Sequence, residues 1–352
     1  MLRKTSAVFI ASLAAVMLLT GCVLPTPDKG AQAEQKTLDS LTQLTDGVYF
    51  MDCYTDYMVD DYLKANISDI EHFDKWMTEN LTHGVPTGDI PEMACSSFAV
   101  SAPDGDHLFG RNYELTGGHS MIIRTAPENG YASLCIADLR QINLGKNGDY
   151  KLDDEKGRSL LFAAPWAIAD GVNEKGLGVS LLELNDKHIV TDTDKDDLLI
   201  YAATRVILDK CASVDEAIRF FEDHDVYSGR PNTYHFFITD ASGRSAVVEW
   251  VDGEMQVVED NAVTNFTLYG REITDSTDLR YFKLRKGLDE TDSMTSGDAM
   301  ALLEAVTSTA PTAGPPFTIW RDSALRSASM RIFPIHTHIP EERNREETRL
   351  TL

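Results

Sequence analysis

The chain has 352 residues, of which 43% are hydrophobic and 25% charged, with 23 Gly and 13 Pro. These are ordinary globular proportions, and they exclude collagen-like, coiled-coil and wholly disordered chains. Lys and Arg number 32 and Asp and Glu 56, so the formal net charge is −24. A phosphate backbone repels a surface this acidic, so we expect no nucleic-acid partner.

The chain begins with a predicted export signal over residues 1–21. Arg3 and Lys4 form a short positive region, and an apolar stretch follows from about Ala7 to Leu19. That stretch is too short to span a bilayer permanently and is typical of a signal peptide. It ends in Leu19-Thr20-Gly21-Cys22, which resembles the bacterial lipoprotein lipobox.

The lipobox predicts cleavage before Cys22 and attachment of lipid to its sulfur. Acyl chains anchor a protein stably because each buried CH₂ contributes about 0.8 kcal/mol. Losing residues 1–21 removes two positive charges, so the mature chain carries 30 positive and 56 negative charges, or −26. We therefore expect an exported protein, held by lipid to the outer side of the cell membrane, with a flexible linker over residues 22–37. An ordinary signal peptide with a chance cysteine is the alternative.

Residues 38–94 are expected to form a helical segment with short loops. Tyr54, Met58 and Tyr62 recur at helical spacing. Ser68-Asp69-Ile70-Glu71 carries a weak capping signature that opens a second helix. The segment ends in a turn-rich connector over residues 84–91.

From Cys95 onward the pattern changes to strands. Strand-like stretches on either side of short turns predict three β-hairpins, over 96–111, 167–184 and 235–250. Four helices are expected between and after the last two hairpins: 198–208, 214–222, 278–286 and 298–306. Hairpins interleaved with helices predict an α+β fold of antiparallel sheets covered by helices.

The five cysteines are Cys22, Cys53, Cys95, Cys135 and Cys211. No pair has C-x-x-C spacing, which argues against zinc ribbons and thioredoxin-like redox motifs. An exported protein can pair its remaining thiols, but a chain this long does not need disulfides to fold. We assign no disulfide among them.

Two sequence patterns resemble metal-binding motifs. His336-x-His338 lies in a Pro-flanked tail and is interpreted as a pair of exposed loop histidines. Asp192-x-Asp194-x-Asp196 opens like a calcium loop but has Asp197 and Ala203 where the loop needs Gly and Glu. We interpret it as a solvated acidic loop, and we expect no metal and no cofactor.

The most informative cysteine is Cys95, at the start of the first hairpin. Arg111 follows sixteen residues later across that hairpin, beyond the strand end, where its long side chain can reach back toward the sulfur. A fixed cation beside a thiol lowers the thiol's pKa and makes it more reactive. A structural cysteine beside a surface arginine produces the same pattern, so the pair alone does not define a nucleophile.

Five stretches recur in a fixed order over most of residues 95–285. They are Cys95-Ser96-Ser97-Phe98 with Gly110-Arg111-Asn112; Asp170-Gly171-Val172-Asn173-Glu174-Lys175-Gly176-Leu177-Gly178; Phe237-Ile238-Thr239-Asp240 with Val247-Val248-Glu249; Val263-Thr264-Asn265; and Leu279-Arg280-Tyr281. Together they resemble the choloylglycine hydrolase superfamily of N-terminal nucleophile (Ntn) hydrolases, which includes bile salt hydrolases, penicillin V acylases, acid ceramidase and N-acylethanolamine acid amidase. The resemblance implies a four-layer αββα sandwich.

The resemblance also implies a precursor that cuts itself between Ala94 and Cys95. Residues 38–94 would then be the propeptide and residues 95–352 the catalytic domain. Cleavage frees the α-amino group of Cys95, whose reference pKa of about 7.7–8.0 lets it take the thiol proton near neutral pH. One residue supplies both nucleophile and base, so no catalytic His is needed.

Four further residues take roles from the same resemblance. Arg111 corresponds to the arginine that steadies the thiolate. Glu114 stands where the family usually has an Asp that orients the α-amino group, and is one methylene longer. Asn265 corresponds to the Asn whose side-chain N–H helps form the oxyanion hole, and Arg280 to a second active-site arginine.

Glu183 departs from the pattern of bile salt hydrolases and penicillin acylases, which have Asn there as an oxyanion donor. An ionised carboxylate cannot donate a hydrogen bond. The ceramidase and acid amidase branch uses Glu at this point, and the helical propeptide also suits that branch. The resemblance therefore favours hydrolysis of linear N-acyl amides with a fatty acyl part, through a Cys95 thioester. For Glu183, a tolerated polar residue at a strand edge is the alternative.

Other functions stay open at this point. The same thioester serves acyl transfer to an amine, and a bile salt or penicillin V-type amidase fits most of the same residues. A degenerate family member that only binds amphiphiles is a third possibility, and a papain-like peptidase is a weaker one because no His stands out as a partner. The sequence also leaves open the oligomeric state and whether the propeptide stays bound after cleavage.

Overall fold

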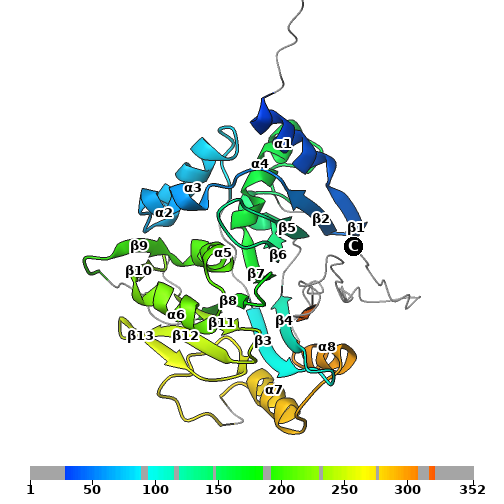
Figure 1. Cartoon of the computed structure of the whole chain (residues 1–352), viewed down its shortest axis with the longest axis vertical. Coiled ribbons are helices and arrows are strands. Elements are labelled where there is room, and N and C mark those ends of the chain that lie inside the picture. The colour runs from blue at the N-terminus through cyan, green and yellow to red at the C-terminus, as the bar shows by residue number, and fades with distance from the viewer. Residues whose placement is uncertain are drawn as a thin grey trace, which may run out of the picture.

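The computed structural model describes most of the chain from residue 28 onward (Figure 1). Cys22, the connector residues 89–93, and the tail with His336 and His338 lie outside the described residues. The described ranges are 28–88, 94–114, 119–145, 148–184, 192–229, 233–274, 277–307 and 317–321.

Within these ranges nine strands form one large sheet, in the order β1-β2-β5-β6-β7-β8-β11-β12-β13 (Figure 1). Neighbouring strands run antiparallel except β2 and β5, which are parallel. The expectation of antiparallel sheets fails for this pair because a long crossover through two helices and a hairpin separates β2 from β5. The strands are β1 Thr42–Thr45, β2 Val48–Cys53, β5 Ser120–Thr125, β6 Ser133–Asp138, β7 Ile168–Asn173, β8 Gly178–Leu184, β11 Thr233–Thr239, β12 Ser245–Val251 and β13 Glu254–Val258.

A second, smaller sheet has the order β14-β3-β4-β15. The antiparallel register of β3 and β4 sets Cys95 opposite Tyr113 and Ser97 opposite Arg111. Strand β14 pairs with β3 on its other side. The strands are β3 Ala94–Ser101, β4 His107–Glu114, β14 Ala262–Val263 and β15 Phe317–Arg321.

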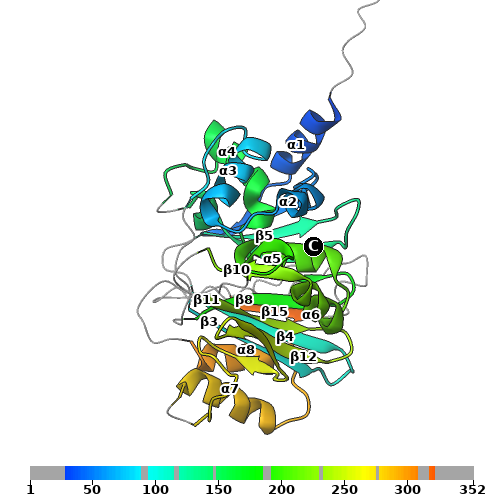
Figure 2. The ribbon, with the colours of Figure 1, turned by 90° about the vertical axis from the view of Figure 1, so that its left-hand side faces the viewer.

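Helices cover the outer faces of the two stacked sheets (Figure 2). Helix α5 (Ile200–Lys210) packs on β7 and β8, and α6 (Val214–Glu222) packs on β11 and β12. On the opposite side, α7 (Leu279–Asp289) packs on β3 and β14, and α8 (Ser296–Ala305) on β4 and β15. Strand β3 contacts β8 and β11 across the sheet interface. The predicted α+β class and four-layer αββα arrangement are confirmed.

The other elements lie at the N-terminal end and around the large sheet. Strands β9 and β10 form a separate parallel pair. The bounds are α1 Lys29–Asp39, α2 Val59–Ala65, α3 Ile70–Asn80, the 3₁₀ helix η1 Leu139–Ile142, α4 Glu155–Leu160, the 3₁₀ helix η2 Leu161–Trp166, β9 Asp196–Leu199 and β10 His224–Tyr227.

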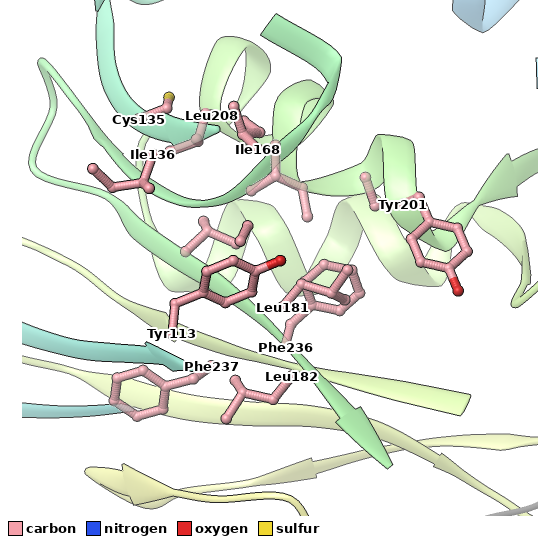
Figure 3. Packing of buried hydrophobic residues seen from close by; sticks show 14 of the residues in the cluster. Tyr113, Cys135, Ile136, Ile168, Leu181, Leu182, Tyr201, Leu208, Phe236 and Phe237 are labelled. Atoms are coloured by element: carbon pink, nitrogen blue, oxygen red, sulfur yellow. The ribbon is translucent and has the colours of Figure 1, made fainter. Parts of the chain in front are cut away.

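Side chains from both sheets form the core between them. Every residue of β7, β8 and β11 is buried, because helices cover one face of these strands and the small sheet covers the other. The rings of Phe109 on β4 and Phe237 on β11 lie 6.0 Å apart across the interface. Figure 3 shows buried side chains of this core, which include Tyr113 of β4 and Leu181 and Phe237 of the large sheet. This packing holds the first hairpin against β8.

All three predicted hairpins and all four predicted helices form, with changes at their ends. Helix α5 begins at Ile200 rather than at 198 because residues up to Leu199 belong to β9. Helix α6 has the predicted bounds, and the Ser213 side chain caps it by accepting from the Glu216 amide.

Two predictions for the N-terminal segment need correction. Residues 38–94 are not all helical, because Thr42–Thr45 and Val48–Cys53 are strands and β2 lies inside the large sheet. The β2 sequence is rich in β-branched and aromatic residues, which favour strands. The flexible linker expected over 22–37 is wrong from Lys29 onward, where α1 begins with Asp28 as its N-cap.

Buried contacts bind this N-terminal segment to the remainder of the fold. The Tyr57 hydroxyl donates to Asp209 Oδ2 at 2.9 Å, and the backbone carbonyl of Tyr57 accepts from Trp166 Nε1 at 2.8 Å. Asp209 in turn forms a fully buried ion pair with Arg205 of α5. Three rings of the segment pack around Trp166 with centroids 4.8–5.7 Å away: Tyr62, Phe73 and Trp76.

Three further observations concern the described residues only. None of their helices combines the length and apolar character needed to cross a bilayer. They contain no group of three or more His, Cys, Asp or Glu residues suited to a metal ion, and Asp192, Asp194 and Asp196 do not form one. Their four cysteines, Cys53, Cys95, Cys135 and Cys211, are buried free thiols.

Candidate active site

Cys95 and Arg111 meet at the centre of the site. Arg111 Nη2 lies 2.9 Å from Cys95 Sγ, and both residues have no exposed surface. Arg111 lies within β4 rather than beyond its end, two positions from the residue opposite Cys95. Residues two apart point to the same face of a sheet, so the guanidinium reaches the sulfur diagonally across the hairpin. The predicted contact is therefore present.

The Arg111 guanidinium is held on several sides. It donates through Nη2 to the Leu181 carbonyl at 2.8 Å and through Nη1 to Ser97 Oγ at 3.2 Å. Ser97 Oγ lies 2.9 Å from Ser180 Oγ on the facing sheet. Arg111 Nε lies 3.8 Å from Asp170 Oδ2, and both side chains are buried. These contacts join β4 to β7 and β8 and fix the cation beside the sulfur.

Asn265 contacts Cys95 from the other side. Its Oδ1 accepts from the Cys95 backbone nitrogen at 2.7 Å, and its Nδ2 donates to the Glu183 carbonyl at 2.7 Å. Strand β14 pairs with β3 through Val263 and Ser97, which carries Asn265 alongside Cys95. Asn265 therefore holds the nitrogen of the candidate nucleophile and bridges the two sheets.

Arg280 completes the ring of contacts. Its Nη1 donates to the Cys95 carbonyl at 3.2 Å, and its Nη2 donates to Asn265 Oδ1 at 3.1 Å. Asp278, the N-cap of α7, pairs with the same guanidinium at 3.3 Å. The start of α7 thus brings a second cation to Cys95, as the sequence predicts.

The two predicted glutamates differ in what the structure describes. Glu183 is buried on β8, and its backbone carbonyl meets Asn265. Glu114 lies opposite Ala94 in the β3–β4 register, so its backbone is beside the Ala94–Cys95 bond. The Glu114 side chain lies outside what the structure describes. The structure therefore brings Glu183 and Glu114 to the site by position without testing the role of either carboxylate.

Tyr113 links the site to the large sheet. Its hydroxyl donates to Asp138 Oδ2 at 3.1 Å, and Asp138 also pairs with Arg140 at 2.8 Å. Burial, the Asp138 carboxylate and Cys95 raise the pKa of Tyr113 well above its usual value. Tyr113 therefore stays protonated and acts as a neutral neighbour of Cys95.

Glu249 on β12 fixes the segment that follows Asn265. Its buried carboxylate accepts from the backbone nitrogens of Leu268 at 3.2 Å and Tyr269 at 2.5 Å. His235 Nδ1 lies 3.2 Å from the same carboxylate, and both side chains are fully buried. Strand pairing at Val263 and this carboxylate therefore hold the two ends of the segment that carries Asn265.

The three other described cysteines have raised thiol pKa values. Burial raises the pKa of the Cys53 thiol to about 11 and that of Cys211 to about 12. Burial also raises the pKa of Cys135, although Arg205 Nη1 lies 3.4 Å from its sulfur. These thiols are poor nucleophiles near neutral pH, because the thiolate is the reactive form.

Sequence reasoning missed the roles of four residues in this site. Asp170 and Glu249 lie within the stretches that carry the resemblance, and Ser97 does as well, but a sequence does not reveal what each side chain touches. Ser180 lies outside those stretches, and no motif in the sequence indicated a role for it. Their partners lie on other strands or loops, so the pairing of strands had to be known first.

The arrangement suits nucleophilic attack by sulfur. A thiol is placed beside a guanidinium, its backbone nitrogen is held by an amide oxygen, and its carbonyl is bound by a second guanidinium. A nearby cation stabilises a thiolate, and a fixed nitrogen beside the sulfur can act as a base once it is an amine.

Comparisons with known proteins agree with this chemistry. The sequence model of the acyl-coenzyme A:6-aminopenicillanic acid acyl-transferase family matches residues 100–314, more than half of the chain. The match begins beyond Cys95 and includes Arg111, Asp170, Glu183, Asn265 and Arg280.

Two curated relatives are similar over part of their length. A bile salt hydrolase/transferase from Clostridium perfringens (strain 13 / Type A) is 27% identical over 204 residues, which cover 53% of this chain and 59% of the relative. A penicillin V acylase from Pectobacterium atrosepticum is 30% identical over 123 residues, 31% of this chain and 32% of the relative. The chain thus spans about three fifths of the first relative and a third of the second.

Solved structures with weaker sequence similarity also match. A variant of the conjugated bile acid hydrolase from Clostridium perfringens has 18% identity and a TM-score of 0.47, covering 68% of this chain and 89% of that one. A penicillin V acylase from Agrobacterium tumefaciens has 19% identity and a TM-score of 0.47, covering 68% and 82%.

The Glu249 contacts yield a stability prediction. We expect Glu249→Gln to lower the free energy of unfolding by about 1–3 kcal/mol, because the Gln side chain has a single acceptor oxygen for the two buried N–H groups. Amide exchange at Leu268 and Tyr269 should accelerate. Urea unfolding and hydrogen exchange measure both effects. Glu254→Gln, on an exposed residue, is the control. Equal stability and exchange in the two variants would contradict the prediction.

Proposed function

Because the chain belongs to the acyl-coenzyme A:6-aminopenicillanic acid acyl-transferase family, within the Ntn hydrolase superfamily, we propose that it hydrolyses linear carbon–nitrogen amide bonds with Cys95 as nucleophile. The observation that carries the proposal is the contact of Cys95 Sγ with Arg111 Nη2 at 2.9 Å, combined with the Cys95 nitrogen 2.7 Å from Asn265 Oδ1. Relatives named a bile salt hydrolase/transferase and a penicillin V acylase support a small-molecule N-acyl amide as substrate.

Maturation is the first step of the proposed mechanism. Attack of the Cys95 sulfur on the Ala94 carbonyl carbon forms a thioester, and the Cys95 nitrogen leaves as an amine. Water then hydrolyses the thioester, which leaves a carboxylate on Ala94 and a free thiol and α-amine on Cys95. Arg111 supports this step because a cation at 2.9 Å favours the attacking thiolate.

Turnover repeats the same chemistry on an external amide. The α-amine, with a reference pKa of about 7.7–8.0, accepts the thiol proton and then delivers it to the leaving amine. The acyl group remains on the sulfur until water hydrolyses the thioester. Asn265 Oδ1, which already accepts from the Cys95 nitrogen, keeps that amine beside the sulfur.

In the proposed mechanism, Asn265 stabilises the negative charge that develops on the substrate carbonyl oxygen. One of its two amide protons is donated to the Glu183 carbonyl, and the second is the proposed donor to the substrate oxygen. Glu183 cannot donate as a carboxylate, so it takes no part as a donor while it is ionised.

Acyl transfer is the second candidate, and the description of the matched family favours keeping it. An amine replaces water in the last step and takes the acyl group from the same thioester. Turnover of an N-acyl amide with hydroxylamine present separates the two outcomes, since transfer produces the acyl hydroxamate at the expense of the free acid.

The N-terminal segment is proposed to stay bound after cleavage. Strand β2 lies between β1 and β5 in the large sheet, and its removal would uncover the β5 edge. It would also leave Asp209 without the Tyr57 hydroxyl and expose Trp166. Exposing apolar surface and leaving a buried polar group without its partner are both costly, so two associated chains are the expected mature form.

Lipid on Cys22 then anchors the enzyme to the membrane. Because the lipid and the segment share one chain, retention of the segment keeps the catalytic chain at the outer side of the cell membrane. This part of the proposal rests on the lipobox and on the docking of residues 28–88, and Cys22→Ser should release activity into the soluble fraction.

Removal of the sulfur tests the proposed nucleophile. Cys95→Ala should yield an uncut chain with amidase activity at background, because both maturation and turnover need the same thiol. Gel electrophoresis and assay of acyl release measure the two effects. Cys211→Ala, which removes a buried thiol away from Arg111, should mature and turn over. Cleavage or full activity in the Cys95 variant would refute the mechanism.

Retention of the segment is tested on the matured protein. Native size exclusion should give one species, and denaturing gels should resolve it into two chains. Tyr57→Phe should reduce the free energy of dissociation or unfolding by about 1–3 kcal/mol, because a buried carboxylate loses a donor. Tyr54→Phe, on an exposed tyrosine, should change it little. A catalytic chain that purifies alone and active would contradict the proposal.

A further inference from the structure

Arg111 is positioned between two acidic groups. On one side its Nη2 lies 2.9 Å from the Cys95 sulfur, and on the other its Nε lies 3.8 Å from Asp170 Oδ2. The second distance is beyond hydrogen bonding, so the attraction between Arg111 and Asp170 is electrostatic. The two charged side chains are 0% and 1% exposed, which leaves little water to screen them.

Strand pairing and a pair of serines fix the position of Asp170. It lies on β7 opposite Ser180 of β8, and Ser180 Oγ lies 2.9 Å from Ser97 Oγ. Ser97 in turn accepts from Arg111 Nη1 at 3.2 Å. Asp170 therefore lies on the face of the large sheet that the Arg111 guanidinium packs against.

One cation cannot fully neutralise two anions. A buried charge is costly unless it is paired, so the Arg111 guanidinium balances either the Asp170 carboxylate or a Cys95 thiolate. An ionised Asp170 lessens the benefit that Arg111 offers to the thiolate, because like charges oppose each other's formation.

We propose that, once the chain is cut, Asp170 is a positioning residue that neutralises Arg111 and so keeps Cys95 a thiol until the neighbouring amine removes its proton. The inference rests on the proposed function and deepens it. It assigns the thiolate-forming step to the amine rather than to Arg111 alone.

The molecule contains a second arrangement of the same kind. Arg205 Nη1 lies 3.4 Å from Cys135 Sγ, and Asp209 pairs with Arg205 inside the core. At Cys135, burial raises the thiol pKa, Arg205 lowers it and Asp209 raises it. Burial is the main cause of the raised pKa, and the paired guanidinium of Arg205 does not offset it.

Other charged and titratable groups around Cys95 stay constant in the comparison that tests this. On β4 they are Arg111 and Tyr113, with Glu114 at the register position opposite Ala94. The others are Glu183 on β8, Arg280 and Asp278 at the start of α7, and Asp138 with Arg140 beyond Tyr113.

The experiment measures the pH dependence of iodoacetamide alkylation of Cys95 in the matured protein, with mass spectrometry of the peptide that begins at Cys95. Asp170→Asn keeps the size of the side chain and one acceptor oxygen but removes the charge. We expect the midpoint of alkylation to fall by about one pH unit, since nearby charges shift a pKa by one to three units. At a pH below both midpoints, that is an approximately tenfold faster reaction.

Asp209→Asn is the matched control, because it removes the carboxylate of a buried Arg–Asp pair away from Cys95. Its Cys95 midpoint should equal that of the wild type. An unchanged or raised midpoint in Asp170→Asn overturns the inference, because a merely structural Asp170 would release Arg111 and weaken its hold on the thiolate.

A second pair of variants serves if Asp170→Asn does not fold. Arg111→Met with Asp170→Asn removes both charges, which a buried pair tolerates better than the loss of one. Because Asp170 acts through Arg111, the midpoint of the double variant should equal that of Arg111→Met alone, and a midpoint well below it would assign the effect to direct repulsion and overturn the inference. Failure of the proposed function is distinguishable, because it leaves the wild-type chain uncut, whatever Asp170 does.

Discussion

The contact between the Cys95 sulfur and the Arg111 guanidinium is the interaction on which the site depends. It places a full positive charge 2.9 Å from a thiol inside a core that excludes solvent. Such a charge is stable only with partners, and the large sheet supplies them through the Leu181 carbonyl and Asp170. The stacking of two sheets is therefore a requirement of the chemistry as well as of the fold.

The same stacking explains how residues from distant segments of the chain come together around Cys95. Strand β14 delivers Asn265, the N-terminus of α7 delivers Arg280, and both contact the backbone of Cys95. The N-terminal segment contributes to the opposite edge of the large sheet through β2. A cut at Ala94 would thus separate two parts of one folded unit, and the active site would form on a scaffold that both parts support.

The local pattern of the sequence predicted the hairpins and helices well, because their turns and caps lie within a few residues. Family motifs located Cys95, Arg111, Asn265 and Arg280. The strands β1 and β2 of the N-terminal segment were missed although they pair locally and β2 has strand-forming residues, and the pairing of β2 with β5, far along the chain, had no local signal. Asp170 and Glu249 were visible as motif residues, but their contacts with Arg111 and with the segment after Asn265 arise only from strand pairing. Long-range pairing thus limits what a sequence alone reveals.

The central claim is that the amine of Cys95 is free in the working protein. N-terminal sequencing of the purified protein tests it most directly. The account predicts a chain that begins Cys-Ser-Ser-Phe and carries the amidase activity. A protein that is fully active while Ala94 and Cys95 are still joined would contradict it.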